Sequence, residues 1–108
     1  MLENLQDPRI LKALSETSGK FSLKTLMICN YVPGLIFRAV TESGNSYLFE
    51  IIEPATKLLH VVRLEARPGD PEAGYRGQRR ISGEVAVGKP IFYGDSSTSP
   101  VKQLVLIG

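Results

Sequence analysis

The feature of the sequence that most constrains the fold is a change in the spacing of its apolar residues at Gly19. Before this glycine, Ile10, Leu11 and Leu14 recur at helical spacing, and after it apolar residues recur at every second position in several short runs. A period of three to four residues is typical of an amphipathic helix, and a period of two is typical of a half-buried β-strand. We therefore expect one short helix followed by a β-rich region.

The predicted helix covers residues 7–17 and follows an N-terminal arm of residues 1–6. Asp7 is a favourable N-cap, and Pro8 occupies the first helical position, where its missing N–H leaves no hydrogen bond unmade. Gly19 is placed to end the helix in the left-handed conformation. Because a helix this short is marginally stable alone, we expect its apolar stripe to pack on a sheet.

Strands are predicted within residues 21–107, where polar turns separate the apolar runs. The clearest pair covers residues 35–40 and 46–53, which are joined by a polar connection that contains Gly44. Further strands are expected at residues 57–66, 81–87, 91–93 and 101–107. Residues 67–77 contain prolines and glycines but no aliphatic side chain larger than alanine, so we expect a long exposed loop there.

The whole chain, residues 1–108, is expected to form a single α+β domain that is mostly β. A chain of 108 residues fits one domain, and 43% hydrophobic residues are enough to build a core. No helical segment separates the predicted strands, which favours antiparallel pairing. We predict a small antiparallel barrel or a curved sheet with one N-terminal helix, because barrel closure would remove apolar sheet edges.

Composition excludes some classes of site and indicates a compartment. Cys29 and His60 are the only residues of their kinds, so one chain forms neither a disulfide nor a zinc site of Cys and His ligands. We expect no metal and no cofactor. Charged residues interrupt the N-terminal apolar residues that a signal peptide requires, and no apolar run reaches the roughly 20 residues of a membrane helix. We expect a cytoplasmic protein that does not enter membranes.

His60 is a candidate pocket residue. Alternation places it on the same face of its predicted strand as Leu58, Val62 and Leu64. A buried imidazole needs a hydrogen-bond partner and can serve as an acid or a base. Two interpretations follow, namely a structural histidine or the centre of a small enzyme or ligand-binding barrel. The first is favoured, because no phosphate loop, serine nucleophile motif or triad is recognisable and the catalytic residues of an enzyme remain unknown.

Arginines gather around the predicted loop. Residues 75–80 contain one tyrosine, three arginines and no acid, and Arg63 lies nearby in the sequence. An arginine binds phosphate through two parallel hydrogen bonds, and an aromatic ring stacks on bases. Glu65, Asp70 and Glu72 offset part of this positive charge, and the net charge of +2 does not by itself require a nucleic-acid partner. The candidate binding residues are Arg67, Tyr75, Arg76, Arg79 and Arg80.

The leading functional interpretation is a non-enzymatic binding or interaction module that holds nucleic acid, or another anionic partner, through this arginine-rich loop. A further alternative is a homo-oligomeric structural subunit, in its simplest form a homodimer. This alternative rests on the last predicted strand, which is apolar on both faces at its end and carries Lys102 as its one charge. A sheet edge of that composition favours pairing with a second copy, unless an earlier strand pairs with it or the predicted helix covers it within the chain.

Overall fold

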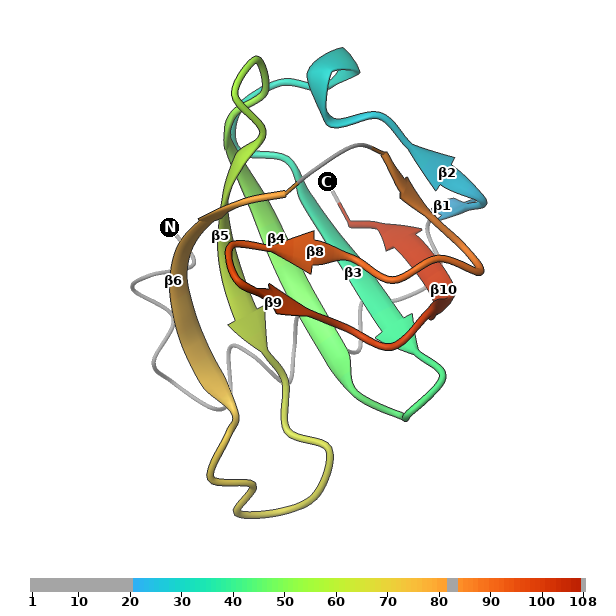
Figure 1. Ribbon diagram of the computed structural model, residues 1–108, viewed down its shortest axis with the longest axis vertical. Helices are drawn as coiled ribbons and strands as arrows, with labels where there is room; N and C mark the ends of the chain where they lie inside the picture. The colour runs from blue at the N-terminus through green and yellow to red at the C-terminus, as the bar shows by residue number, and fades with distance from the viewer. Residues whose placement is uncertain (1–20, 82–83, 108) are drawn as a thin grey trace.

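The computed structural model describes residues 21–81 and 84–107, which form a six-stranded antiparallel sheet and two short strand pairs. The order of the sheet is β1-β10-β3-β4-β5-β6, and the short pairs are β2–β7 and β8–β9 (Figure 1). The strands are β1 (Phe21–Leu23), β2 (Thr25–Leu26), β3 (Ile36–Thr41), β4 (Ser46–Glu53), β5 (Leu58–Arg63), β6 (Gly74–Arg80), β7 (Val85–Ala86), β8 (Phe92–Tyr93), β9 (Ser96–Ser97) and β10 (Val101–Leu106).

The centre of the sheet is made of β3, β4 and β5, which follow one another in the chain. The turn between β3 and β4 is closed by the Thr41 N–H, which donates to the Asn45 carbonyl at 2.8 Å, and by the Gly44 N–H, which donates to the Thr41 carbonyl at 2.9 Å. Gly44 has a φ of +91°, a conformation that glycine adopts without steric strain. The predicted hairpin of residues 35–53 is confirmed.

One face of the sheet carries the main hydrophobic core. Phe37 and Phe49 are fully buried there, with their ring centroids 4.9 Å apart. The two short strand pairs pack on this face, and Figure 1 shows β8 and β9 crossing in front of β4. The opposite face carries a smaller apolar cluster, which consists of Ile36, Leu48, Val62 and Leu64 with Tyr75 and Ile107 packed against it. Successive side chains along each strand point to opposite faces, so the same strands contribute apolar residues to both clusters.

The predicted α+β class is wrong for the part of the chain that the structure describes. Its one helical element is the 3₁₀ turn η2 (Ile28–Asn30), and the remainder is strand, turn and loop, so these residues are all-β. The predicted helix of residues 7–17 lies outside the described residues. Within them, no helix is long and apolar enough to cross a membrane.

The predicted barrel is also wrong, because the sheet is open. Its edges are β1 and β6, which stand at opposite ends of the strand order. Closure requires these two strands to pair, and β1 has only three residues to offer a seven-residue partner. The apolar core face is instead covered by the two short strand pairs. Turns at residues 88–90 and 94–95 reverse the chain, and this allows the short strands to cross the sheet.

The last strand, β10, is an interior strand. It pairs with β1 on one side and with β3 on the other, and Leu104 and Val105 are fully buried on its two faces. Its apolar character is therefore used within the chain, and it has no unpaired edge to offer a second copy. The reason given for a homodimer is lost, and self-association by another surface stays a prediction.

Candidate nucleic-acid interface

Strand β6 is the edge strand that carries most of the predicted binding residues. Among the described strands it pairs with β5 alone, and it begins at Gly74, within the stretch that was expected to be a loop. The connection between β5 and β6 accordingly spans residues 64–73. Arg76, Arg79 and Arg80 are all exposed on this strand. These three arginines thus stand on a strand that is hydrogen-bonded to the sheet, and this fixes where their side chains begin.

A β-bulge reshapes the middle of β6. Val61 pairs with Gly77 while the next residue of β5, Val62, pairs with Tyr75, so Arg76 has no residue opposite to it. Gly77 has a φ of +94°, in the region that favours glycine. A Cβ at this position would lie 3.2 Å from Nη1 of Arg79. The bulge bends the strand, as bulges do, and the bare glycine leaves room for the Arg79 guanidinium to lie across it.

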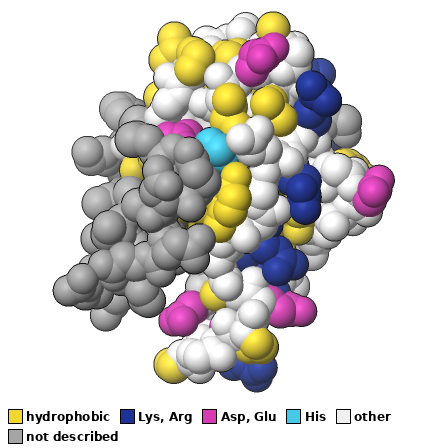
Figure 2. Space-filling model, turned by 90° about the vertical axis from the view of Figure 1, so that its left-hand side faces the viewer, with side chains coloured by type: hydrophobic (Ala, Val, Ile, Leu, Met, Phe, Trp, Pro, Cys, Tyr) yellow, Lys and Arg dark blue, Asp and Glu magenta, His cyan; other side chains and the backbone are white. Residues whose placement is uncertain are grey.

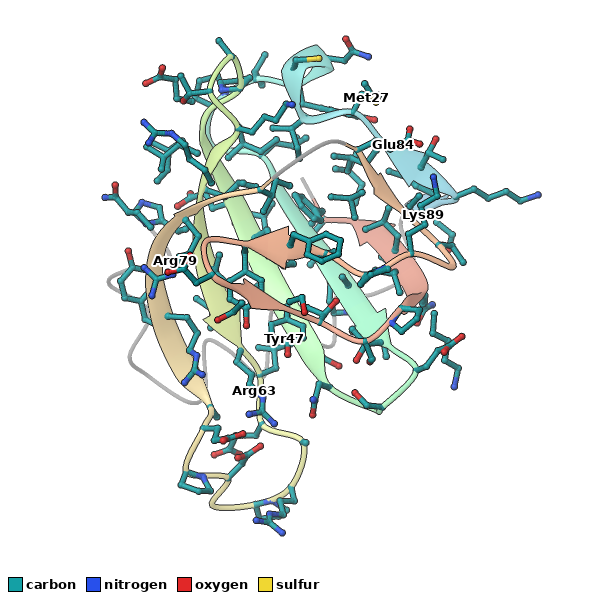
Figure 3. All side chains as sticks on the ribbon, in the orientation of Figure 1. Met27, Tyr47, Arg63, Arg79, Glu84 and Lys89 are labelled. Atoms are coloured by element: carbon teal, nitrogen blue, oxygen red, sulfur yellow. The ribbon has the colours of Figure 1, made fainter. Side chains whose placement is uncertain are left out.

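Arg79 lies between β6 and the turn of the β8–β9 hairpin (Figure 3). Its Cδ is 3.2 Å from the place that a Cβ of Gly94 would occupy. The same turn is tied to β6 by the Gly94 N–H, which donates to the Arg80 carbonyl at 3.1 Å, and by a bridge between Ile81 and Tyr93. The hairpin turn and the edge strand therefore form one continuous surface.

The three exposed arginines of β6, called the β6 arginines below, straddle the edge of the sheet. Arg79 is opposite Leu59, whose side chain is in the main core, so Arg79 lies on the hairpin side. Arg80 follows it and therefore projects to the other side of the strand.

Arg76 donates to the Glu72 carbonyl oxygen at 3.4 Å, and its charge acts on Tyr47. Burial and the neighbouring Tyr93 raise the pKa of Tyr47, while Arg63 and Arg76 oppose that rise.

None of the β6 arginines forms an ion pair with another described residue. Strand β6 itself contains no acid. Figure 2 shows Lys and Arg side chains spaced down the face on which β6 lies, with acidic side chains near its upper and lower ends and at its right-hand margin. Positive charge on this edge is therefore available to an anion from solution.

Arg63 differs from the β6 arginines because it is neutralised within the fold. Its guanidinium forms ion pairs with Glu72 and, at 3.7 Å, with Asp70, and it also donates to Oδ1 of Asn45 at 3.0 Å. The hydrogen bond that Arg63 donates to the Glu72 carboxylate raises the pKa of Arg63. Figure 3 shows Arg63 directed toward the loop below it. It holds the loop of residues 64–73 to the sheet and is not presented to a ligand.

Arg67, one of the predicted binding residues, lies in the same loop and is exposed. Its charge helps to lower the pKa of Asp70, although the larger causes are the hydrogen bonds that the carboxylate accepts from the N–H groups of Glu72 and Ala66. These bonds measure 3.0 Å and 3.2 Å. Arg67 thus faces local negative charge, and the structure separates it from the β6 arginines.

Replacing Asp70 by Asn is expected to loosen this loop in a pH-dependent way. Since the pKa of Asp70 is lowered in the folded protein, its stabilising effect is complete above the ordinary value of 3.8 and is lost as the pH falls through the lower, folded value. Urea unfolding of the wild type and the Asp70→Asn variant should differ at neutral pH and converge in acid. A difference of the same size at neutral pH and in acid that protonates Asp70 in the folded protein would contradict this role.

Tyr75 and His60 lie on the other face of the sheet, away from the hairpin. His60 is 6% exposed, and its Nδ1 is hydrogen-bonded to the Tyr75 hydroxyl at 2.8 Å. Glu50, also buried, is directly opposite His60 on β4. A catalytic base must come within hydrogen-bond distance of its substrate, and the small exposed surface of His60 does not favour such an approach. The arrangement supports the structural interpretation of His60. Tyr75 lies on the face toward which Arg80 projects, with its hydroxyl engaged by His60, and away from Arg79 and the hairpin.

Two residues of this surface were missed by sequence reasoning, namely Phe92 and Gly94. Phe92 is 52% exposed on β8, while the next residue, Tyr93, is buried against Tyr47. A phenylalanine in a short apolar run reads as a core residue, and only the packing of the hairpin shows which ring faces solvent. Comparison of the chain with protein-family models, with curated proteins and with solved structures finds no match.

Proposed function

We propose that this protein is a non-enzymatic binding module whose β6 arginines hold the phosphates of a nucleic acid. The observation that supports this proposal most directly is the exposure of Arg76, Arg79 and Arg80 on an acid-free edge strand without ion pairs to other described residues. A guanidinium is always charged and fits a phosphate through two parallel hydrogen bonds. The unpaired cysteine fits a cytoplasmic location, which belongs to the same proposal.

The internal neutralisation of the loop supports the same function. The two carboxylates that come just before β6 in the sequence, Asp70 and Glu72, are both engaged by Arg63. Acids held in this way repel a phosphate less than free carboxylates would, because their charge is partly balanced. Since the net charge is only +2, we expect binding to be local to β6 rather than spread over the surface.

The affinity for a single-stranded oligonucleotide is expected to fall with salt concentration, with a slope set by the number of phosphates that the arginines contact. Three phosphate contacts predict a slope of about −2 for log affinity against log salt, and hence a loss of about 20-fold between 50 and 200 mM salt. Fluorescence anisotropy with a fluorescein-labelled oligonucleotide of about 12 nucleotides, a length suited to a small β domain, measures this slope.

The triple variant Arg76→Gln, Arg79→Gln and Arg80→Gln should abolish the binding. A matched control carries Lys24→Gln, Lys89→Gln and Lys102→Gln, which removes the same charge from exposed positions outside β6. We expect the control to stay within about twofold of the wild type, because distant surface charges are screened. Equal losses in the two triple variants, or no binding by the wild type at low salt, would overturn the proposal. Thermal unfolding of both variants checks that they fold.

A further inference from the structure

The exposed ring of Phe92 belongs to the hairpin whose turn packs beside Arg79 of β6. Its strand neighbour Tyr93 points inward, with its ring centroid 6.2 Å from that of Tyr47, so alternation directs Phe92 to the outer side of the hairpin. A single exposed hydrophobic residue needs no explanation by itself. Phe92 is significant because it is two residues from Gly94, where an added Cβ would lie 3.2 Å from Cδ of Arg79.

The two residues that follow Phe92 place no exposed side chain between its ring and Arg79. Tyr93 is buried and Gly94 has no side chain, so neither covers the surface between the Phe92 ring and the aliphatic part of the Arg79 side chain. Two strand residues span about 7 Å. Ser97, opposite Phe92, and Ser96, opposite Tyr93, are exposed and small. The ring face and the guanidinium are thus within reach of one ligand.

We propose that the hairpin β8–β9 and the edge strand β6 form one site for single-stranded nucleic acid, in which the β6 arginines hold phosphates and a base stacks on Phe92. This inference rests on the proposed function and adds the class of nucleic acid to it. Stacking on an aromatic side chain requires a free base face, which a single strand offers and a duplex does not. Asp95, exposed in the hairpin turn, repels phosphate there and favours bases over the hairpin.

The test compares Phe92→Ala with the wild type on two probes, a single-stranded oligonucleotide and inorganic polyphosphate. Loss of a stacked base weakens binding of the oligonucleotide about tenfold or more, whereas polyphosphate, which has no bases, should bind both proteins equally. A duplex of the same length should bind more weakly than the single strand and should not respond to the variant. Equal binding of the oligonucleotide by Phe92→Ala and the wild type would overturn the inference, and so would equal losses on both probes.

A second variant, Phe92→Trp, supplies a direct signal for stacking. The chain contains no tryptophan, so this residue would be the sole indole in the protein. We expect its fluorescence to be quenched by the oligonucleotide and to be unchanged by polyphosphate. Quenching by both probes, or by neither, would contradict stacking on this residue.

The outcomes separate the inference from the proposed function on which it rests. If the β6 triple variant loses the oligonucleotide while Phe92→Ala retains it, the phosphate site stands and the stacking site fails. If the wild type binds neither probe, both fail. Tight binding of polyglutamate that is independent of Phe92 would identify an acidic peptide as the partner and would also overturn the inference.

Discussion

Truncation of Phe49 to alanine is expected to lower the free energy of unfolding by about 3–5 kcal/mol. Phe49 is fully buried in the central strand β4, where its ring stacks on Phe37 at 4.9 Å and lies 6.1 Å from Tyr47. Its removal forfeits both the burial of the ring and the contacts of its neighbours around the cavity. Because a small domain is stable by about 5–15 kcal/mol, a loss of this size consumes much of the total.

Urea unfolding followed by far-UV circular dichroism measures this effect, and Phe92→Ala is its matched control. The control removes the same atoms from a ring that is 52% exposed, so its unfolding free energy should stay within about 0.5 kcal/mol of the wild type. Equal destabilisation by the two variants would show that Phe92 is covered in solution. That result would contradict the open site on the hairpin, whereas a Phe49→Ala variant as stable as the wild type would contradict the place of Phe49 in the core.

The central hairpin was predictable from the sequence because its signals are local. Residues 46–53 were expected as a strand and are β4, and residues 35–40 correspond closely to β3. A polar connection with a glycine at a positive φ is itself sufficient to reverse the chain there. Alternation then fixed which side chains enter the core, as the burial of Phe37 and Phe49 shows.

Strand β6 was not predictable in the same way. Gly74 and Gly77 are typical of loops, and a strand whose side chains are mostly in solvent shows no apolar alternation. It is a strand because β5 offers a row of backbone partners to it, and that pairing is invisible in the segment itself. Position in the sheet also determines which arginines are neutralised. Proximity in the sequence could not show that Arg63 would form ion pairs with the loop while Arg79 would not.

The assignment of β10 shows how one pattern supports two folds. A strand that is apolar on both faces indicates either an exposed edge that needs a partner or an interior strand covered on both sides. Sequence reasoning weighed the first of these in favour of a dimer. The structure shows the second, with β1 and β3 as neighbours, and such long-range pairing is not encoded in any single segment.

Replacement of Leu104 by lysine is accordingly expected to unfold the domain. Leu104 is fully buried in β10, opposite Leu23 of β1 and Ala39 of β3. Loss of a buried leucine costs about 2–5 kcal/mol, and the ammonium adds the free energy of burying a charge or of deprotonating it. The sum is comparable to the whole stability of a domain of this size. Far-UV circular dichroism should show loss of the β signal.

Gln103→Lys is the matched control for this prediction, since it places the same side chain on the adjacent, exposed position of the same strand. The control should unfold at the same urea concentration as the wild type, because surface substitutions change stability by about 0.5 kcal/mol or less. Sedimentation equilibrium completes the experiment. A Leu104→Lys variant that remained folded and converted a dimer into a monomer would place Leu104 in an interface between copies. Unfolding of that variant beside an intact control would instead show that β10 belongs to the core of its own chain.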